Sequence, residues 1–168
     1  MQKIIVIGCP GAGKSTFARG LRDITGLPLY YLDMIWHKPD GNNVSREDFD
    51  TALDEILVRD RWIIDGNYQR TLEKRLEVCD TVFLLDFPLE VCLAGAQSRI
   101  GMKREDLPWL ETQFDPEFRR WIEEFPEKKL PEIYKMLEKY RAEREVIMFR
   151  SRQETDEYLS KLALSFPK

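Results

Sequence analysis

The sequence predicts an α/β fold in which a parallel β-sheet is covered by helices on both faces. Two observations support this prediction. Five short runs are rich in apolar and β-branched residues, and segments with helical periodicity lie between them. Runs that are apolar along almost their whole length are typical of parallel strands, which are buried on both sides. The five predicted strands are Lys3–Ile7, Pro28–Leu32, Trp62–Ile64, Thr81–Leu85 and Val146–Phe149.

The helices between these strands are predicted from apolar faces and capping residues. A helix-like stretch covers Thr16–Thr25, directly after a glycine-rich loop. Ser45 opens a Ser-Arg-Glu-Asp pattern and Ser151 opens a Ser-Arg-Gln-Glu pattern, and both resemble a capping box. Pro88 is well placed as the first residue of another helix. The last helix is expected to bury Leu159, Leu162 and Phe166.

Length and composition bound the possible functions. The chain has 168 residues, which fits a single domain spanning residues 1–168. Lys and Arg number 26 against 30 Asp and Glu, so the net charge is −4. This balance argues against bulk binding to nucleic acid, which requires a cationic surface, although a local basic patch stays open. The three cysteines form no Cys-x-x-Cys pair, and with one histidine they fit neither a disulfide framework nor a zinc site.

No targeting or membrane segment is expected from the sequence. No apolar run reaches about 18 residues, the length that a membrane-spanning helix needs. The first predicted strand begins at Lys3, which leaves no room for a signal peptide. We therefore expect a cytoplasmic protein with reduced thiols, whose oligomeric state the sequence does not indicate.

The most informative feature is a phosphate-binding loop at Gly8–Ser15. It reads G-C-P-G-A-G-K-S between the first strand and the first helix, which is the strand–loop–helix context of the G-x-x-x-x-G-K-[ST] motif. Its backbone N–H groups and the following helix N-terminus would surround phosphate oxygens. We expect ATP, with Lys14 at the β- and γ-phosphates and the Ser15 hydroxyl on Mg²⁺. The predicted nucleotide-binding residues of this segment are Gly8, Pro10, Gly11, Ala12, Gly13, Lys14, Ser15 and Thr16.

Polar residues follow the second and third predicted strands, where ligands of parallel sheets bind. Asp33 is predicted to orient or deprotonate the hydroxyl of an acceptor substrate. Asp65 is predicted to bind on the metal side and to lie beside the acceptor. Tyr68 comes after the flexible Gly66 and is predicted to line the acceptor pocket. Arg70 either contacts the acceptor or stabilises a helix, and the sequence leaves both readings open.

A long irregular segment after the fourth strand is predicted to be a lid. Ile100–Pro116 has weak periodicity and two prolines and is long for a connection, so we expect a lid over residues 100–118 rather than a plain surface excursion. Arg99 ends the preceding helix and Arg104 lies within the segment. Cations here would stabilise the charge of a phosphoryl group in transfer. The candidate catalytic residues are Lys14, Asp33, Arg99 and Arg104.

Taken together, these motifs resemble the bacterial DNA topology modulation proteins. The resemblance rests on the phosphate loop, on Tyr31–Asp33, on Trp62–Tyr68 and on Leu84–Pro88, with matching spacing to Trp121–Ile122, and it covers nearly the whole chain. That group is similar to the adenylate-kinase-like small-molecule kinases. The resemblance implies a P-loop NTPase fold, a three-layer α/β/α sandwich with sheet order 2-3-1-4-5. It also implies a substrate-binding helical segment after strand two and a lid after strand four.

The resemblance also implies roles for single residues. Asp65-Gly66 resembles the Asp-Gly of adenylate kinases, whose Asp lies on the metal side. Arg99 resembles the arginine at the base of the lid, and the loop at residues 150–152 would lie near the adenine, so Arg150 is predicted to bind nucleotide. After Asp-Gly, adenylate kinases read Phe-Pro-Arg, whereas this chain reads Asn-Tyr-Gln-Arg. The resemblance therefore secures neither the acceptor contact of Arg70 nor a nucleoside monophosphate acceptor.

The leading hypothesis is a Mg²⁺-dependent kinase that transfers the γ-phosphoryl group of ATP to a small-molecule hydroxyl compound, such as a nucleoside or nucleotide. Two alternatives stay open. One is a nucleotide-dependent regulatory protein that affects DNA topology and hydrolyses ATP slowly. The other is an NTPase without an acceptor. The sequence identifies neither the acceptor nor the preferred purine, because backbone groups usually recognise the base.

Overall fold

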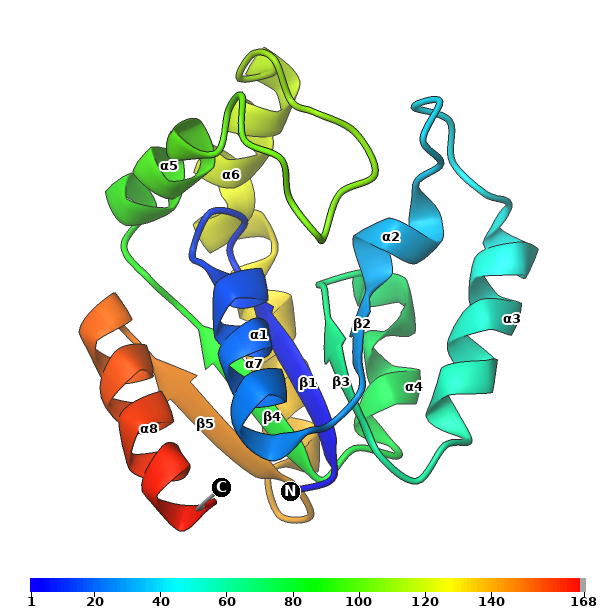
Figure 1. Cartoon of the computed structure of the whole chain (residues 1–168), viewed down its shortest axis with the longest axis vertical. Coiled ribbons are helices and arrows are strands. Elements are labelled where there is room, and N and C mark those ends of the chain that lie inside the picture. The colour runs from blue at the N-terminus through cyan, green and yellow to red at the C-terminus, as the bar shows by residue number, and fades with distance from the viewer. Residues whose placement is uncertain (167–168) are drawn as a thin grey trace.

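The computed structural model describes residues 1–166, and its centre is a five-stranded, all-parallel sheet (Figure 1). The strand order is β2-β3-β1-β4-β5, so the predicted fold class and strand order are confirmed. Each predicted strand is present, and no end is shifted by more than one residue. The strands are β1 (Lys3–Gly8), β2 (Leu29–Tyr31), β3 (Trp62–Asp65), β4 (Thr81–Leu85) and β5 (Glu145–Phe149).

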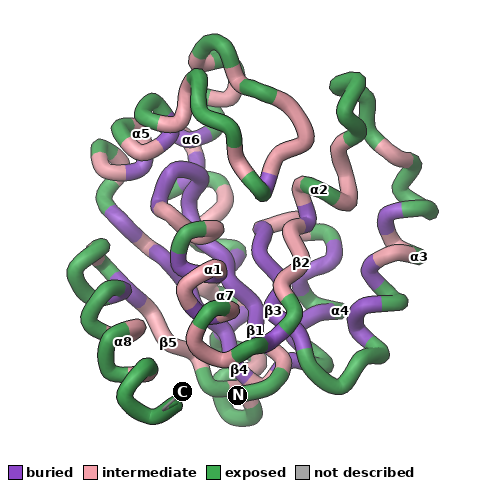
Figure 2. Tube along the Cα trace, in the orientation of Figure 1, coloured by how far each residue is buried: buried purple, intermediate pink, exposed green. Residues whose placement is uncertain are grey.

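Burial explains why the central strands are apolar. Every residue of β3 and β4 is buried, as is every residue of β1 after Lys3, and Figure 2 shows these strands at the centre of the molecule. The parallel register aligns the strand ends, because Val6 pairs with Asp65 and Gly8 pairs with Leu85. The loops after β1 and β3 therefore emerge side by side at one edge of the sheet.

Helices cover both faces of the sheet. In Figure 1, α1 and α8 lie in front of the sheet and α7 lies behind it, which gives three layers. None of the helices within residues 1–166 is both long and apolar enough to cross a membrane. The helices are α1 (Lys14–Thr25), α2 (Leu32–Trp36), α3 (Arg46–Leu57), α4 (Leu72–Leu76) after a 3₁₀ turn η1 (Gln69–Thr71), α5 (Leu89–Ser98), α6 (Pro116–Lys128), α7 (Leu130–Tyr140) and α8 (Arg152–Ser165).

Two predicted helix caps are confirmed, and two details are wrong. The Ser45 hydroxyl accepts the N–H of Asp48 at 3.0 Å, and the Ser151 hydroxyl accepts that of Glu154 at 3.3 Å. Pro88 is the N-cap of α5 rather than its first residue. Phe166 lies past the last residue of α8 and is 44% exposed, so it is not part of the core. Leu159 and Leu162 of α8 are half-buried against the core.

Residues 99–115 form the long connection that was predicted as a lid, and we keep the name lid for this segment, although its movement stays a prediction. It ends three residues earlier than expected, because the Asp115 carboxylate caps α6 by accepting the N–H groups of Glu117 at 2.7 Å and Phe118 at 3.1 Å. Its base is closed by the Gly101 N–H, which donates to the Glu111 carbonyl at 2.7 Å. In Figure 1 this connection lies over the edge of the sheet where β1 and β3 end.

Candidate functional site

The phosphate loop wraps from the end of β1 into the start of α1. Gly11 has φ +85°, and a Cβ there would lie 1.9 Å from the carbonyl oxygen of Cys92 on α5, so the loop requires glycine at this position. Gly13 is the N-cap of α1 with φ 96°, and it provides no capping side chain. The amides at the start of α1 are thus left for another acceptor, the arrangement that favours phosphate.

Lys14 folds back on this loop. Its ammonium group donates to the Cys9 carbonyl at 3.3 Å, and the side chain lines the cavities described below. Gly11, Gly13 and Thr16 line the cavity on the α1 side, and Pro10 lines the other one. Gly8 and Ala12 line neither cavity and are buried, so any contribution that they make to phosphate binding comes through the loop backbone.

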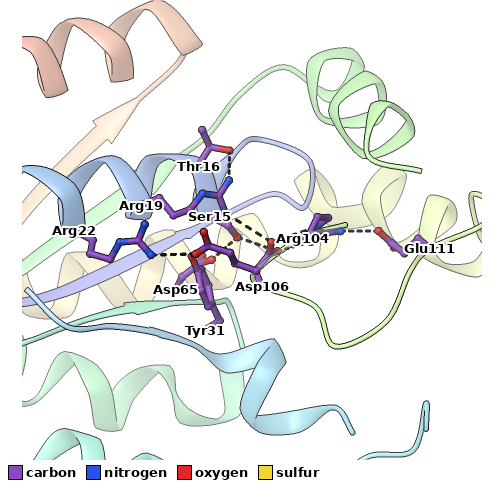
Figure 3. A network of polar contacts seen from close by, with 10 residues as sticks. Ser15, Thr16, Arg19, Arg22, Tyr31, Asp65, Arg104, Asp106 and Glu111 are labelled. Carbon is purple, nitrogen blue, oxygen red and sulfur yellow. Dashed lines mark hydrogen bonds and ion pairs between the residues drawn. The ribbon is translucent and has the colours of Figure 1, made fainter. Parts of the chain in front are cut away.

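The Ser15 hydroxyl lies between two carboxylates (Figure 3). It is 2.5 Å from Asp65 Oδ2 at the end of β3 and 3.2 Å from Asp106 Oδ2 of the lid. Asp106 is buried, forms an ion pair with Arg104 and lies 3.9 Å from Arg19 of α1. Burial is the largest influence on the Asp106 carboxyl and would raise its pKa, but the hydrogen bond and charge of Arg104, together with hydrogen bonds from the backbone and from Ser15, hold the pKa below its usual value. The lid is thus joined to the phosphate loop through an ionised carboxylate.

These oxygens fit a magnesium ion. Asp65 is 5% exposed, and its Oδ1 is buried without a hydrogen-bond partner among the described residues. Burial, opposed by Lys14, raises the pKa of Asp65 to about 6, as expected for a carboxylate with too few partners. Within residues 1–166 no three His, Cys, Asp or Glu side chains gather to hold a metal alone. Mg²⁺ commonly uses one or two carboxylates and keeps waters and phosphate oxygens, which matches this set.

Two cavities meet at this point. One, of about 420 Å³, lies along the phosphate loop and the start of α1. The other, of about 860 Å³, lies between the lid, α2 and the loop after β3. We call them the donor cavity and the acceptor cavity. The side chains that line both are Lys14, Ser15, Arg99, Arg104 and Asp106.

The two lid arginines differ in their partners. Arg104 is held by Asp106 and by Glu111, whose Oε2 lies 2.6 Å from its Nη1. No ion pair or side-chain hydrogen bond of Arg99 occurs within residues 1–166, and its buried Nε has no partner. Burial, followed by repulsion from Arg104, lowers the pKa of the Arg99 guanidinium. A cation without a counterion at the junction of two cavities is suited to bind an anionic group there.

Asp33 and Tyr68 come together in the acceptor cavity, although 35 residues separate them. Asp33 lies in the first turn of α2, and the Tyr68 hydroxyl donates to its Oδ1 at 2.8 Å. Burial, followed by the charge of Asp33, raises the pKa of Tyr68, so the phenol remains a hydrogen-bond donor. This contact fixes one carboxylate oxygen, and the other is left for a ligand.

The two remaining predicted binding residues are engaged elsewhere. Arg70 lines the acceptor cavity, but its guanidinium forms a bidentate pair with Asp50 of α3, with the shorter distance 2.6 Å. Arg150 pairs with Asp86 and lines neither cavity. From the same loop, Arg152 lines the donor cavity and donates to the Gly11 carbonyl at 3.3 Å. The structure thus places Arg152, rather than Arg150, at the phosphate loop.

The sequence reasoning missed two residues that shape the loop after β3. Asn67 Oδ1 accepts the Gly8 N–H at 3.0 Å, and its Nδ2 donates to the Gly8 carbonyl at 2.9 Å. Arg75 is fully buried, and its guanidinium donates to the carbonyls of Gly66 and Tyr68 at 2.8 and 3.2 Å and to that of Asn67. Tyr68 itself has φ 37°, a conformation unusual for a residue other than glycine. The sequence did contain a signal for the burial of Arg75, because Leu72 and Leu76 of the same short helix are apolar and buried with it.

Asp106 was also missed, because the prediction for the lid considered only the basic residues of that segment. The sequence pattern that could have indicated an acidic partner is Lys103–Asp106, in which two acidic residues follow two basic ones. Only the fold shows that Asp106, and not Glu105, reaches the phosphate loop. Glu105 is exposed and pairs with Arg22 at 3.0 Å.

Comparison with known sequences finds partial similarity. The chain is 30% identical over 97 residues to the adenylate kinases of Thermotoga petrophila and Thermotoga maritima. The match covers 56% of this chain and 43% of each relative, so the chain spans less than half the length of the curated relatives it matches. A comparison with models of known protein families finds no match.

Comparison with solved structures supports the fold along the whole chain. A gluconokinase from Sinorhizobium meliloti 1021 superposes with a TM-score of 0.57 and 15% identity, over 98% of this chain and 91% of that one. A shikimate kinase from Acinetobacter baumannii, in complex with shikimate, superposes with a TM-score of 0.54 and 19% identity, over 100% and 96%. The chain therefore shares the three-layer α/β/α fold of these two proteins.

Proposed function

We propose that this protein is an ATP-dependent phosphotransferase that acts on a hydroxyl group of a small molecule. The observation that carries the proposal is that the donor and acceptor cavities have lining residues in common. We call these residues, Lys14, Ser15, Arg99, Arg104 and Asp106, the shared wall. Lys14, Arg99 and Arg104 place three cations where the cavities meet, and phosphoryl transfer requires positive charge around the group in transfer. A protein that only hydrolyses a nucleotide does not need an acceptor cavity of about 860 Å³.

The donor cavity would bind the triphosphate of ATP. The backbone of residues 8–15 and the N-terminus of α1 provide the N–H groups, and Lys14 turns from the Cys9 carbonyl to the β- and γ-phosphates. Mg²⁺ would be held by Ser15 and Asp65, with Asp106 as a further carboxylate from the lid. The ion would neutralise phosphate charge as the transfer proceeds.

The acceptor hydroxyl would meet Asp33, which lines the acceptor cavity. Its oxygen forms the new bond to the γ-phosphorus, the bond between that phosphorus and the β,γ-bridging oxygen breaks, and ADP leaves. The hydroxyl proton passes to Asp33, whose orientation the Tyr68 hydroxyl maintains. Arg99 faces the group in transfer as an uncommitted cation, and Arg104 joins it when phosphate competes with Asp106 and Glu111.

Similarity supports the reaction class. The matched relatives are adenylate kinases, and the similar structures are a gluconokinase and a shikimate kinase. Membership of the DNA topology modulation family and a nucleotide role for Arg150 stay predictions.

The test is Mg·ATP binding by calorimetry, followed by ADP formation with and without candidate acceptors. We expect binding, and turnover that rises with at least one small hydroxyl compound. Stimulation by DNA alone, with a steep dependence on salt concentration, would instead support the regulatory alternative.

A further inference from the structure

Part of the lining of the acceptor cavity is aromatic. Five side chains form what we call the aromatic wall, and they come from three segments: the end of α2, the lid and α6. The His37 and Trp109 rings meet edge to face at 4.8 Å, and this contact joins α2 to the lid. Phe118 and Trp121, three residues apart on α6, have ring centroids 6.0 Å apart. The aromatic wall consists of Trp36, His37, Trp109, Phe118 and Trp121.

The rings of the aromatic wall keep part of their surface accessible. Trp121 is 39% exposed, and Trp36, His37, Trp109 and Phe118 are half-buried, although each of them lines the cavity. Fully core-packed aromatics in this chain, such as Trp62 and Phe83, are inaccessible. Ring surface that stays accessible inside a cavity is suited to pack against an apolar or aromatic ligand.

The charges around the aromatic wall do not favour an anionic ligand. Arg70 is committed to Asp50, and Arg104 to Asp106 and Glu111. Two carboxylates, Glu111 and Asp115, line this part of the cavity, against Lys129, for which no ion pair occurs within residues 1–166. Because Glu111 is itself paired with Arg104, Asp115 and Lys129 remain with opposite charges, so this part of the cavity offers no excess positive charge to an anionic ligand.

Polar groups line the same cavity. Asp33, held by Tyr68, lies on α2 three residues before Trp36, and Arg99 lines the donor cavity as well. A ligand with a flat ring and a hydroxyl group would match the aromatic wall and Asp33 at once. A polyol or sugar acid without a ring would leave the aromatic wall in contact with water.

We propose that the acceptor is an uncharged alcohol that carries a planar aromatic ring, the chemical class to which nucleosides belong. Its ring packs on the aromatic wall, and its hydroxyl meets Asp33. This inference rests on the proposed phosphotransferase function. The products are ADP and the phosphate monoester of the alcohol, with the hydroxyl proton released through Asp33.

The experiment is calorimetry on the full chain saturated with Mg²⁺ and a non-hydrolysable ATP analogue. Three groups of probes are titrated: nucleosides, ring-free polyols and sugar acids, and nucleoside monophosphates. We expect at least one nucleoside to bind at least about tenfold more tightly than any member of the other groups. Tighter binding by a polyol, a sugar acid or a monophosphate, or no binding by any nucleoside, contradicts the proposal.

Variants locate the binding at the aromatic wall. Trp109→Leu should weaken nucleoside binding about tenfold, and Trp109→Phe should restore most of it. The matched control is Tyr30→Leu, because Tyr30 is a half-buried aromatic residue on β2 that lines neither cavity. Unchanged nucleoside binding in Trp109→Leu overturns the assignment. Titration of the ATP analogue alone separates the two possible failures. If no nucleoside binds but the analogue binds to the wild type and to every variant, only the proposed acceptor class is wrong. If the wild type does not bind the analogue, the proposed phosphotransferase function fails.

Discussion

The donor and acceptor cavities are built in different ways. The donor cavity is built around one short continuous segment, Gly11–Arg19, whose phosphate loop offers backbone groups and one lysine, and the end of α5, the lid and Arg152 complete its lining. The acceptor cavity combines side chains from α2, the loop after β3, the lid and α6, which are distant in sequence. The difference teaches that the phosphate loop is encoded by one continuous segment, whereas the cavity in which we propose that the acceptor binds depends on how remote segments meet.

This difference predicts whether a single substitution should affect ATP binding, turnover or both. A change in the donor cavity should reduce ATP binding and turnover together. A change in the acceptor cavity should reduce turnover and leave ATP binding intact. Substitutions at the shared wall should show intermediate behaviour.

The largest effect is expected for Lys14→Ala. Removal of the ammonium group takes away charge from the β- and γ-phosphates, so turnover should fall about 10³-fold and ATP affinity should fall with it. The measurements are ADP formation and calorimetry with Mg·ATP. Lys38→Ala, in an exposed loop outside both cavities, is the control. Activity like that of the wild type in Lys14→Ala would remove the basis of the donor cavity.

Asp33→Asn should reduce turnover about 100-fold, since a general base is lost while the shape of the side chain is kept. ATP affinity should stay within about twofold. Asp40→Asn, in the exposed turn after α2, controls for the loss of charge. A parallel loss of turnover and ATP affinity would mean that Asp33 acts on the metal or on the fold, and the division between the two cavities would not hold.

A smaller effect is expected for Asp106→Asn at the shared wall. If the lid carboxylate helps to hold the cation, the Mg²⁺ concentration needed for half-maximal binding of an ATP analogue should rise about tenfold. Calorimetry across a Mg²⁺ series measures this. Glu105→Gln, the exposed neighbour paired with Arg22, should leave the series unchanged. Tighter binding in Asp106→Asn would show that Asp106 instead competes with the ligand for the closed lid.

The smallest effect is expected for Asn67→Ala, which removes the contact between the loop after β3 and the phosphate loop. Loss of its two hydrogen bonds to Gly8 should lower the free energy of unfolding by about 1 kcal/mol, because water can replace part of them. Urea unfolding measures this, with Asn42→Ala in an exposed loop as the control. A stability equal to that of the wild type would mean that the two loops hold their positions independently.

Much of the fold could be predicted from the sequence, because burial on both faces makes each central strand a continuous apolar run. The strand order came from the resemblance and agrees with the structure. The irregular connection after α5 is shorter than predicted, because Asp115 caps α6 inside what looked like an irregular segment. Phe166 was predicted to lie on the buried face of the last helix, whereas the helix ends one residue before it.

The site was predictable where backbone motifs define it and less so where side chains meet. Gly8–Ser15 needed no tertiary information. The pairing of Asp33 with Tyr68 and the arrival of Asp106 at Ser15 depend on the sheet register and on the lid path. Arg70 was left with two possible roles, and its bidentate pair with Asp50 adds a contact that no local pattern announced. Arg150 and Arg152 differ by two positions, and only the start of α8 determines which one faces the loop.

The central claim is that the two cavities meet so that a phosphoryl group passes from one to the other. Phosphorus NMR of the protein with Mg·ATP tests this most directly, with nucleosides, ring-free alcohols and nucleoside monophosphates added in turn. We predict a new phosphate monoester resonance that appears with ADP in equal amount when the right acceptor is present. Formation of ADP and inorganic phosphate alone, at the same rate with every acceptor, would contradict the account.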